Sequence, residues 1–116
     1  MPGRSSRSVR IFYPRHNREA VIEALRAGLA RLRTRLPIRR AVLFGSYARG
    51  RFTVASDIDL LVVYEGAPRE DAYALVRRAV GLRGLEPHVY AESEYAAVAS
   101  TVERMIAGGV ELVPSS

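Results

Sequence analysis

Two aspartates one residue apart, Asp57 and Asp59, begin an apolar run that ends at Tyr64. In a β-strand, side chains at positions i and i+2 point to the same face, so both carboxylates are expected on one side of a sheet. Two carboxylates held close together repel each other and raise each other's pKa. A divalent cation between them removes that repulsion, and oxygen ligands select Mg²⁺ or Mn²⁺ rather than zinc. The pair therefore predicts a metal site at the start of this strand.

A second motif, Gly45 followed by Ser46, lies upstream at the end of another apolar run. If a helix begins at Ser46, its first backbone N–H groups point outward at the positive end of the helix dipole, where they can bind phosphate. Gly45 allows the backbone to bend and to approach a ligand closely. Arg49 is a candidate for neutralising phosphate charge, or for an ion pair that only holds the loop. Ten residues, 47–56, separate this phosphate-binding motif from Asp57.

The combination of Gly-Ser, ten intervening residues and Asp-x-Asp resembles the signature of the nucleotidyltransferase superfamily typified by DNA polymerase beta. The strings GSYARG and SDIDLLV are similar to those of its small prokaryotic members, the minimal nucleotidyltransferases. The resemblance implies a nucleotidyltransferase-like fold. It also implies an enzyme that uses two Mg²⁺ or Mn²⁺ ions to transfer a nucleoside monophosphate, most simply AMP from ATP, to a hydroxyl group. Asp57 and Asp59 would hold the metal, and Gly45, Ser46 and Arg49 would bind the phosphates.

Members of this superfamily usually add a third carboxylate on a later strand, where it helps to hold the metal and to activate the acceptor hydroxyl. Glu86 is the candidate here for this catalytic and metal-binding role, although Asp is the usual residue and Pro87 follows directly. His88 is expected on the same face as Glu86, as a ligand, a base or a half-buried structural residue, because imidazole titrates near neutral pH. The alternative to a metal site is that Asp57 caps a helix or a loop and that Asp59 is a surface carboxylate. If Glu86 is badly placed, the expected outcome is nucleotide binding without turnover.

Relatives of this size often work beside a small helical protein of the HEPN type, as the antitoxin half of a toxin–antitoxin pair. By that resemblance, the acceptor is a tyrosine on the partner, and the partner completes the acceptor site. Two other interpretations stay open: a non-catalytic antitoxin that acts by partner binding alone, and a basic protein that binds nucleic acid. The acceptor, the preferred nucleotide and the oligomeric state, a homo-oligomer included, are not specified by the sequence.

The 116-residue chain has a net charge of +6, and its 18 basic residues are all arginine. This charge favours an anionic ligand, but arginines spread over several elements do not by themselves indicate nucleic-acid binding. No apolar run approaches the roughly 18 residues that indicate a membrane span. The absence of cysteine excludes disulfides and thiol chemistry and favours a cytoplasmic protein.

The apolar pattern predicts a single α/β (α+β) domain over residues 9–116, after a flexible tail at 1–8. A small mixed sheet with helices packed on it is expected. Predicted helices run from the N-cap Asn17 to about Arg35, from Ser46 to about Gly50, from Pro68 to Gly81, and from the N-cap Ser93 to Gly108; predicted strands occupy 38–44, 58–64, 85–91 and 110–113, with a short strand or arm at 9–13. Pro87 favours an edge position for its strand, because proline cannot donate a hydrogen bond to a neighbouring strand.

Overall fold

The computed structural model describes residues 17–52 and 56–113, which form four helices and one four-stranded sheet. In chain order the elements are α1 (Arg18–Leu32), β2 (Ile38–Phe44), α2 (Ser46–Arg49), β3 (Ile58–Tyr64), α3 (Ala72–Val80), β4 (Leu85–Ala91), α4 (Glu92–Met105) and β5 (Val110–Val113). The predicted tail at 1–8 and the short strand or arm at 9–13 lie outside the described residues. None of the described helices is long and apolar enough to span a membrane.

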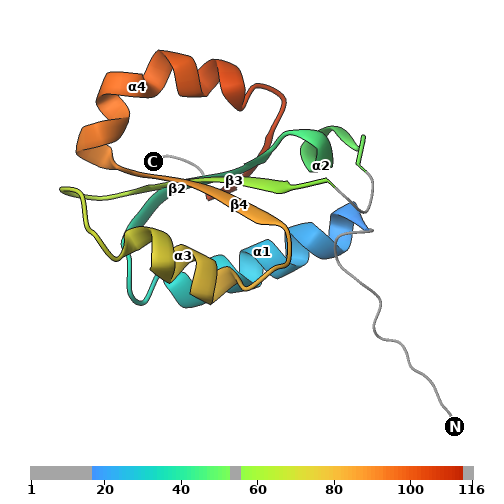
Figure 1. Ribbon diagram of the computed structural model, residues 1–116, viewed down its shortest axis with the longest axis horizontal. Coiled ribbons are helices and arrows are strands. Elements are labelled where there is room, and N and C mark those ends of the chain that lie inside the picture. Colours follow the sequence, from blue (N-terminus) through green and yellow to red (C-terminus); the bar gives the residue numbers. More distant parts are fainter. Residues whose placement is uncertain (1–16, 53–55, 114–116) are drawn as a thin grey trace, which may run out of the picture.

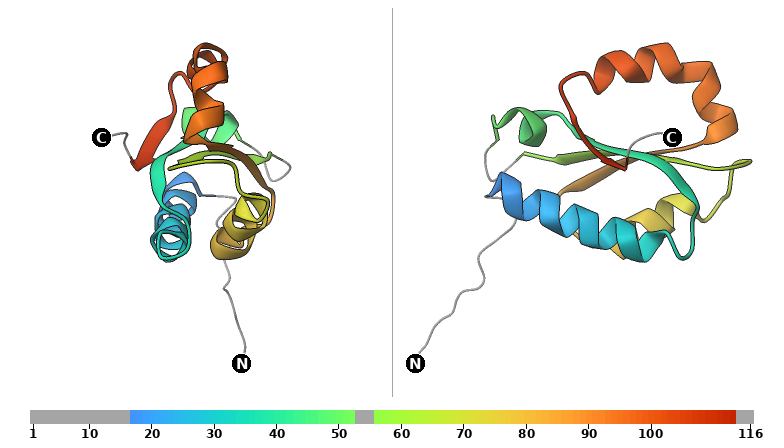
Figure 2. Two further views of the ribbon diagram at one scale, coloured as in Figure 1. Left: turned by 90° about the vertical axis from the view of Figure 1, so that its left-hand side faces the viewer. Right: turned by 180° about the vertical axis from the view of Figure 1, so that it is seen from behind.

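The sheet is mixed, with the strand order β4-β3-β2-β5. Strands β3 and β4 are parallel, whereas β2 is antiparallel to both β3 and β5. Helices α1 and α3 cover one face of the sheet, and α4 covers the other (Figures 1 and 2). This arrangement confirms the predicted small mixed sheet with helices packed on it.

The alternation of side chains along the strands divides the apolar core between the two faces. Leu43 and Leu60 belong to the larger cluster, which includes the buried residues of α1 and α3. Val42 and Leu61 belong to a smaller cluster on the opposite face, together with Val102 of α4. Because side chains alternate along a strand, Asp59 lies on the same face as Leu61, which is the α4 side.

The four strands predicted within the described residues are confirmed with their bounds unchanged. Strand β2 begins directly after Pro37 and ends directly before Gly45. Pro87 lies in β4, which is an edge strand as predicted. The bounds of β2 and β3 are visible in the residue types, because each contains an apolar run that ends at residues which interrupt it. Strand β4 is instead recognised by its alternation of buried and more exposed residues.

Helix α1 begins as predicted but ends earlier than predicted. The Asn17 side-chain oxygen accepts hydrogen bonds from the backbone N–H of Glu19 at 2.9 Å and of Ala20 at 3.2 Å. The predicted end at about Arg35 is wrong, because the α-helix ends at Leu32 and the chain continues as a turn. The hydrogen bond from Arg35 N–H to Leu32 O, at 2.8 Å, belongs to that tighter turn.

Two other predicted helix starts are also wrong. Helix α3 begins at Ala72, so Pro68 lies before it rather than in its first turn. Helix α4 begins at Glu92 instead of being capped by Ser93. The Glu94 carboxylate accepts a hydrogen bond from the backbone N–H of Ala91 at 2.8 Å, so a side chain within the first turn caps this helix.

Candidate active site

The turn between β2 and the short helix α2 requires glycine at position 45. Gly45 has φ 79° and ψ −151°, a backbone conformation that is essentially restricted to glycine. Helix α2 follows directly, and Arg49 N–H donates to Gly45 O at 3.2 Å. Ser46 is therefore the first helical residue, as the sequence predicted.

Contacts with the core and with α1 hold α2 in place. The Tyr47 ring is fully buried and stacks on Phe52, with ring centroids 4.2 Å apart. Arg18 Nε donates to Ala48 O at 3.3 Å, which links the first turn of α1 to α2. Because Tyr47 anchors one side of this single turn, Ser46 stays half-buried and Arg49 is exposed.

Asp59 lies directly against the Gly45 turn. The register of β2 and β3 pairs Phe44 with Asp59, so Asp59 lies next to the residue that precedes the turn. A Cβ atom built on Gly45 would overlap Asp59 Oδ2. The predicted metal ligand and the predicted phosphate-binding turn are thus in contact.

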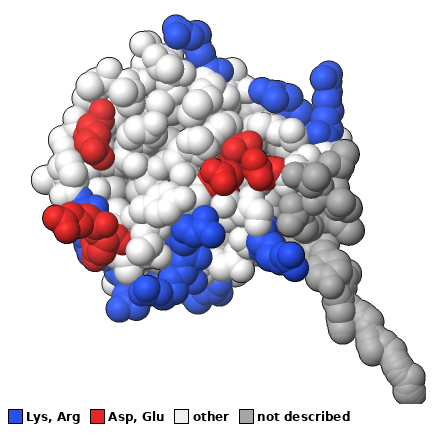
Figure 3. Space-filling view, in the orientation of Figure 1, with Lys and Arg blue, Asp and Glu red and all other residues white. Residues whose placement is uncertain are grey.

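The three predicted carboxylates lie at one end of the sheet. The parallel register of β3 and β4 pairs Asp59 with Glu86, so both residues lie on the α4 side. Asp57 is exposed and lies two residues before Asp59 in the chain, with the buried Ile58 between them. Figure 3 shows acidic side chains near the end of the sheet at which α2 lies, with arginines around them.

The pKa of Asp59 is raised above its ordinary value, mainly because burial disfavours the charged form. The charges of Asp57 and Glu86 also raise it, whereas His88 lowers it. His88 Nε2 lies 3.7 Å from Asp59 Oδ1, and the His88 ring lies 5.1 Å from the Phe44 ring. The negative charge of these carboxylates therefore opposes ionisation of Asp59, and a cation is the natural means of relieving that repulsion.

The residues present provide oxygen ligands but not a ready-made metal cage. Within residues 17–52 and 56–113, no three His, Asp or Glu side chains are grouped closely enough to hold one metal ion. Asp59 interacts instead with His88. The donor set of Asp57, Asp59 and Glu86 is all carboxylate, which suits Mg²⁺ or Mn²⁺. These side chains would have to rotate toward one another to bind an ion together.

The other predicted binding residue, Arg49, forms no ion pair with any carboxylate side chain of the described chain. The alternative role as a loop-holding ion pair therefore has no support. The sequence did not single out Phe44, whose ring packs beside His88. Only the pairing of β2 with β3, and of β3 with β4, brings these two rings together, so no local sequence signal could have identified the contact.

Comparisons with known proteins agree with this geometry. The family model of the nucleotidyltransferase domain matches residues 25–107, which include the whole candidate site. A crystal structure of a Sulfolobus solfataricus protein assigned as a nucleotidyltransferase superposes with a TM-score of 0.58 and 18% sequence identity, over 90% of each chain. At that identity the likeness shows the fold alone. A search of curated proteins gives no match.

Proposed function

This chain belongs to the nucleotidyltransferase domain family, and we propose that it transfers AMP from ATP to a hydroxyl group in a Mg²⁺-dependent reaction. The observation that supports the proposal best is the contact between Asp59 and the Gly45 turn. That contact places an acidic group beside the first N–H groups of α2, so a Mg²⁺-bound triphosphate could touch both. ATP is the simplest donor among the nucleoside triphosphates.

Each residue has a defined role in the proposed reaction. Ser46 and the neighbouring backbone N–H groups bind phosphate oxygens, and Arg49 neutralises part of their charge. Asp57, Asp59 and Glu86 would hold the divalent ions, and the full mechanism would use two such ions. When bound, these ions stabilise the charge on the attacking and leaving oxygens.

The transfer itself forms one bond and breaks another. The acceptor oxygen bonds to the α-phosphorus, the bond from that phosphorus to the bridging oxygen breaks, and pyrophosphate leaves. The hydroxyl proton passes to a basic group of the site. Glu86 and His88 are the candidates, because both lie on the α4 side of β4, beside Asp59.

The sequence resemblance suggests the acceptor. We propose a tyrosine hydroxyl on a HEPN-type partner, which would make this chain the antitoxin of a toxin–antitoxin pair. A cytoplasmic location follows from the same proposal. A homo-oligomer is compatible with it, since one partner surface does not exclude a second copy of the chain.

A second candidate is a binding module that neutralises its partner without catalysis. The observation in its favour is that no three-residue metal group exists among the described residues. Glu86 is exposed, and Asp59 already interacts with His88. If these side chains do not converge when nucleotide binds, contact with the partner remains as the only activity.

One labelling experiment separates the two candidates. The protein is incubated with Mg²⁺ and α-labelled ATP, with and without the protein encoded beside it, and both polypeptides are examined for label. The proposal expects label on the neighbouring protein, loss of label with EDTA, and loss of label with Asp57→Asn. No label with any of the four nucleotides, together with retained binding of the neighbour, would favour the non-catalytic antitoxin.

A further inference from the structure

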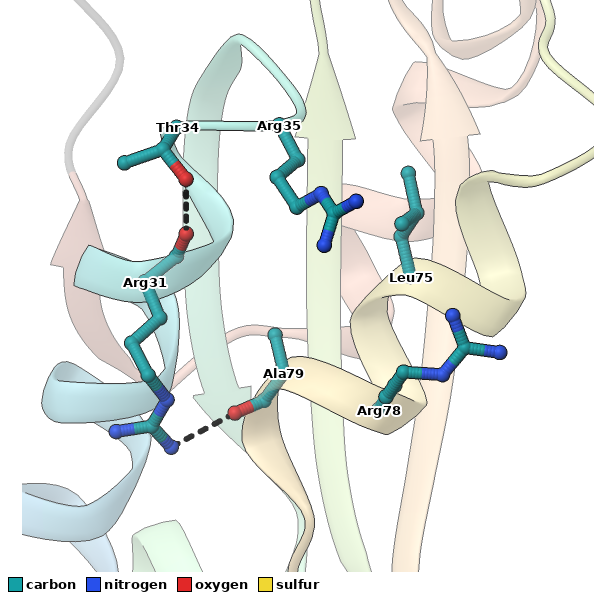
Figure 4. Close-up of a pocket in the computed structure, with 6 residues that line it drawn as sticks. All are labelled: Arg31, Thr34, Arg35, Leu75, Arg78 and Ala79. Atoms are coloured by element: carbon teal, nitrogen blue, oxygen red, sulfur yellow. Dashed lines mark hydrogen bonds between the residues drawn. The ribbon is translucent and has the colours of Figure 1, made fainter.

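A pocket of about 350 Å³ lies between the C-terminal end of α1 and helix α3. It is lined by Arg31, Thr34, Arg35, Leu75, Arg78 and Ala79 (Figure 4). Helices α1 and α3 cover the face of the sheet opposite α4 (Figure 2). Asp59 and Glu86 of the candidate active site lie on the α4 side. The pocket is therefore separate from the carboxylates that would hold metal.

Three arginines line the pocket, and no carboxylate side chain neutralises them. All 12 Asp and Glu residues of the chain lie within the described ranges. Their ion pairs with arginine involve residues elsewhere, namely Arg18, Arg39, Arg40 and Arg69. The guanidinium groups of Arg31, Arg35 and Arg78 form no ion pair with any of them. An anion entering this pocket would not have to displace a carboxylate from any of these three arginines.

Three carbonyl groups of the lining residues already accept hydrogen bonds from side chains. Carbonyls at a helix C-terminus carry partial negative charge, which would otherwise repel an anion. Arg31 O accepts from Thr34 Oγ1 at 2.8 Å, and Arg35 O accepts from Arg69 Nη1 at 3.2 Å. Ala79 O accepts from Arg31 Nη2 at 2.8 Å. These bonds reduce the unfavourable field and also fix the position of one guanidinium group.

The wall formed by Leu75 and Ala79 is apolar, and both residues pack against the larger core cluster. A volume of this size falls at the lower end of the range for small-molecule sites, about 300–1,000 Å³. None of the six lining residues is aromatic, so the pocket offers no ring on which a nucleic-acid base could stack. A small ligand fits these features better than a nucleic-acid strand.

We propose that the pocket between α1 and α3 binds a small phosphorylated ligand, with its phosphate groups on Arg31, Arg35 and Arg78. The planar arginine fork forms paired hydrogen bonds with phosphate oxygens. The apolar wall contacts the non-phosphate part of the ligand. This site is independent of nucleotidyl transfer and needs no divalent metal.

Inorganic pyrophosphate is the test probe, because it supplies phosphate groups without a base or sugar. Binding to the full chain is measured by calorimetry in EDTA and by the shifts of arginine Nε–Hε signals in NMR spectra. Arg78 donates no side-chain hydrogen bond to the part of the chain that the structure describes, so Arg78→Gln breaks none there. This change is expected to weaken binding about tenfold, as the loss of one charge-assisted hydrogen bond predicts. Arg35→Gln combined with Arg78→Gln should remove measurable binding.

Arg104→Gln is the matched control, since Arg104 is an exposed arginine of α4, on the opposite face of the sheet. It makes the same change in net charge and should leave pyrophosphate affinity within about twofold, as expected of a distant, independent site. Equal weakening by Arg78→Gln and Arg104→Gln would overturn the proposal, because net charge alone would then explain the binding. Absence of pyrophosphate binding, with Arg78-dependent binding of a single-stranded oligonucleotide, would overturn it in favour of a nucleic-acid surface.

EDTA keeps this test separate from the proposed enzyme activity, which depends on a divalent metal. Failure of AMP transfer would leave the pyrophosphate result unchanged. A requirement of pyrophosphate binding for Mg²⁺ would contradict the proposed location between α1 and α3.

Discussion

Asp59 Oδ2 occupies the space that a side chain on Gly45 would need. The two residues are brought together by the antiparallel pairing of Phe44 with Asp59. Glycine at this position therefore has two functions: it adopts a backbone conformation with φ 79°, and it leaves room for a carboxylate beside the start of α2. The effect of a substitution at one of these residues on stability should therefore depend on the residue at the other position.

Gly45→Ala should destabilise the protein more than Gly50→Ala. Gly50 also has a positive φ, 75°, but a Cβ atom there would meet nothing within 4 Å. We expect a loss of about 1 kcal/mol in the free energy of unfolding for Gly50→Ala and about 2–4 kcal/mol for Gly45→Ala. Urea unfolding measures both losses.

A double-mutant cycle isolates the part of the stability loss in Gly45→Ala that is due to the overlap with Asp59. Gly45→Ala should cost less in an Asp59→Ala background than in the unmodified chain, because the overlapping carboxylate is then absent. Equal costs in the two backgrounds would show that backbone strain alone accounts for the effect, and that the two residues do not meet.

Asp59→Asn should abolish AMP transfer without lowering stability. The pKa of Asp59 is raised, so its ionised form is disfavoured in the folded protein, and a neutral amide removes that cost. We expect at least a 100-fold loss of transfer with an unchanged or slightly higher melting temperature, as for a residue that acts in the transition state. If Asp59→Asn proves to be both inactive and unfolded, Asp57→Asn tests the role of the carboxylate pair in AMP transfer, because it changes an exposed side chain.

Glu86 and His88 can be separated by substitution. If Glu86 is the third carboxylate, Glu86→Gln should remove the Mg²⁺-dependent rise in melting temperature in the presence of ATP, whereas Glu86→Asp should retain part of it. His88→Gln should leave that rise intact. If His88→Gln removes the rise and Glu86→Gln does not, His88 rather than Glu86 binds the metal. Glutamate at position 86, where the family usually has aspartate, would then be explained.

The ion pairs of Arg40 should make stability depend on pH. Arg40 contacts Glu103 and Glu111, each at 2.5 Å. Hydrogen bonds from Tyr95 and Arg40 lower the pKa of Glu103 below its ordinary value of 4.5. A lowered carboxyl pKa stabilises the fold above the ordinary value, and this contribution is lost as the pH falls from about 4.5 through the folded-state pKa.

Glu103→Gln measures that contribution. Because the Glu103 side chain is 49% exposed, we expect no more than about 1 kcal/mol at neutral pH. The difference in unfolding free energy between the unmodified chain and Glu103→Gln should shrink as the pH drops below 4.5. Glu23→Gln, an exposed change on α1 with no ion pair in the described structure, should show no such trend.

The sequence predicted the strands better than the helix ends, for a physical reason. Strand β2 is an apolar run between Pro37 and Gly45, and both limits are visible in the residue types. The start of α4 depends instead on a hydrogen bond from Ala91 N–H to Glu94, which competes with the plausible cap at Ser93. A choice between neighbouring caps depends on small energy differences, about 1 kcal/mol, that a residue pattern does not reveal.

The family was predictable from the residues and their spacing, but the contacts within the candidate site were not. The spacing of Gly45, Asp57 and Asp59 was sufficient to predict a nucleotidyltransferase. The position of His88 beside Asp59 depends on the parallel register of β3 and β4, which connects residues far apart in the chain. The arginine pocket could not be predicted for the same reason, since Arg31 and Arg78 line one pocket only when α1 and α3 pack together.

The most direct test of the metal–nucleotide site uses Mn²⁺ as a paramagnetic substitute for Mg²⁺. Small amounts of Mn²⁺ are added to the ¹⁵N-labelled protein with ATP, and the broadening of each backbone amide signal is measured. The account predicts that Gly45, Ser46, Asp59 and Glu86 broaden first, and that Asp57→Asn combined with Asp59→Asn prevents it. Broadening that is centred elsewhere, or that persists in this double variant, would contradict the assignment of these carboxylates as the metal site.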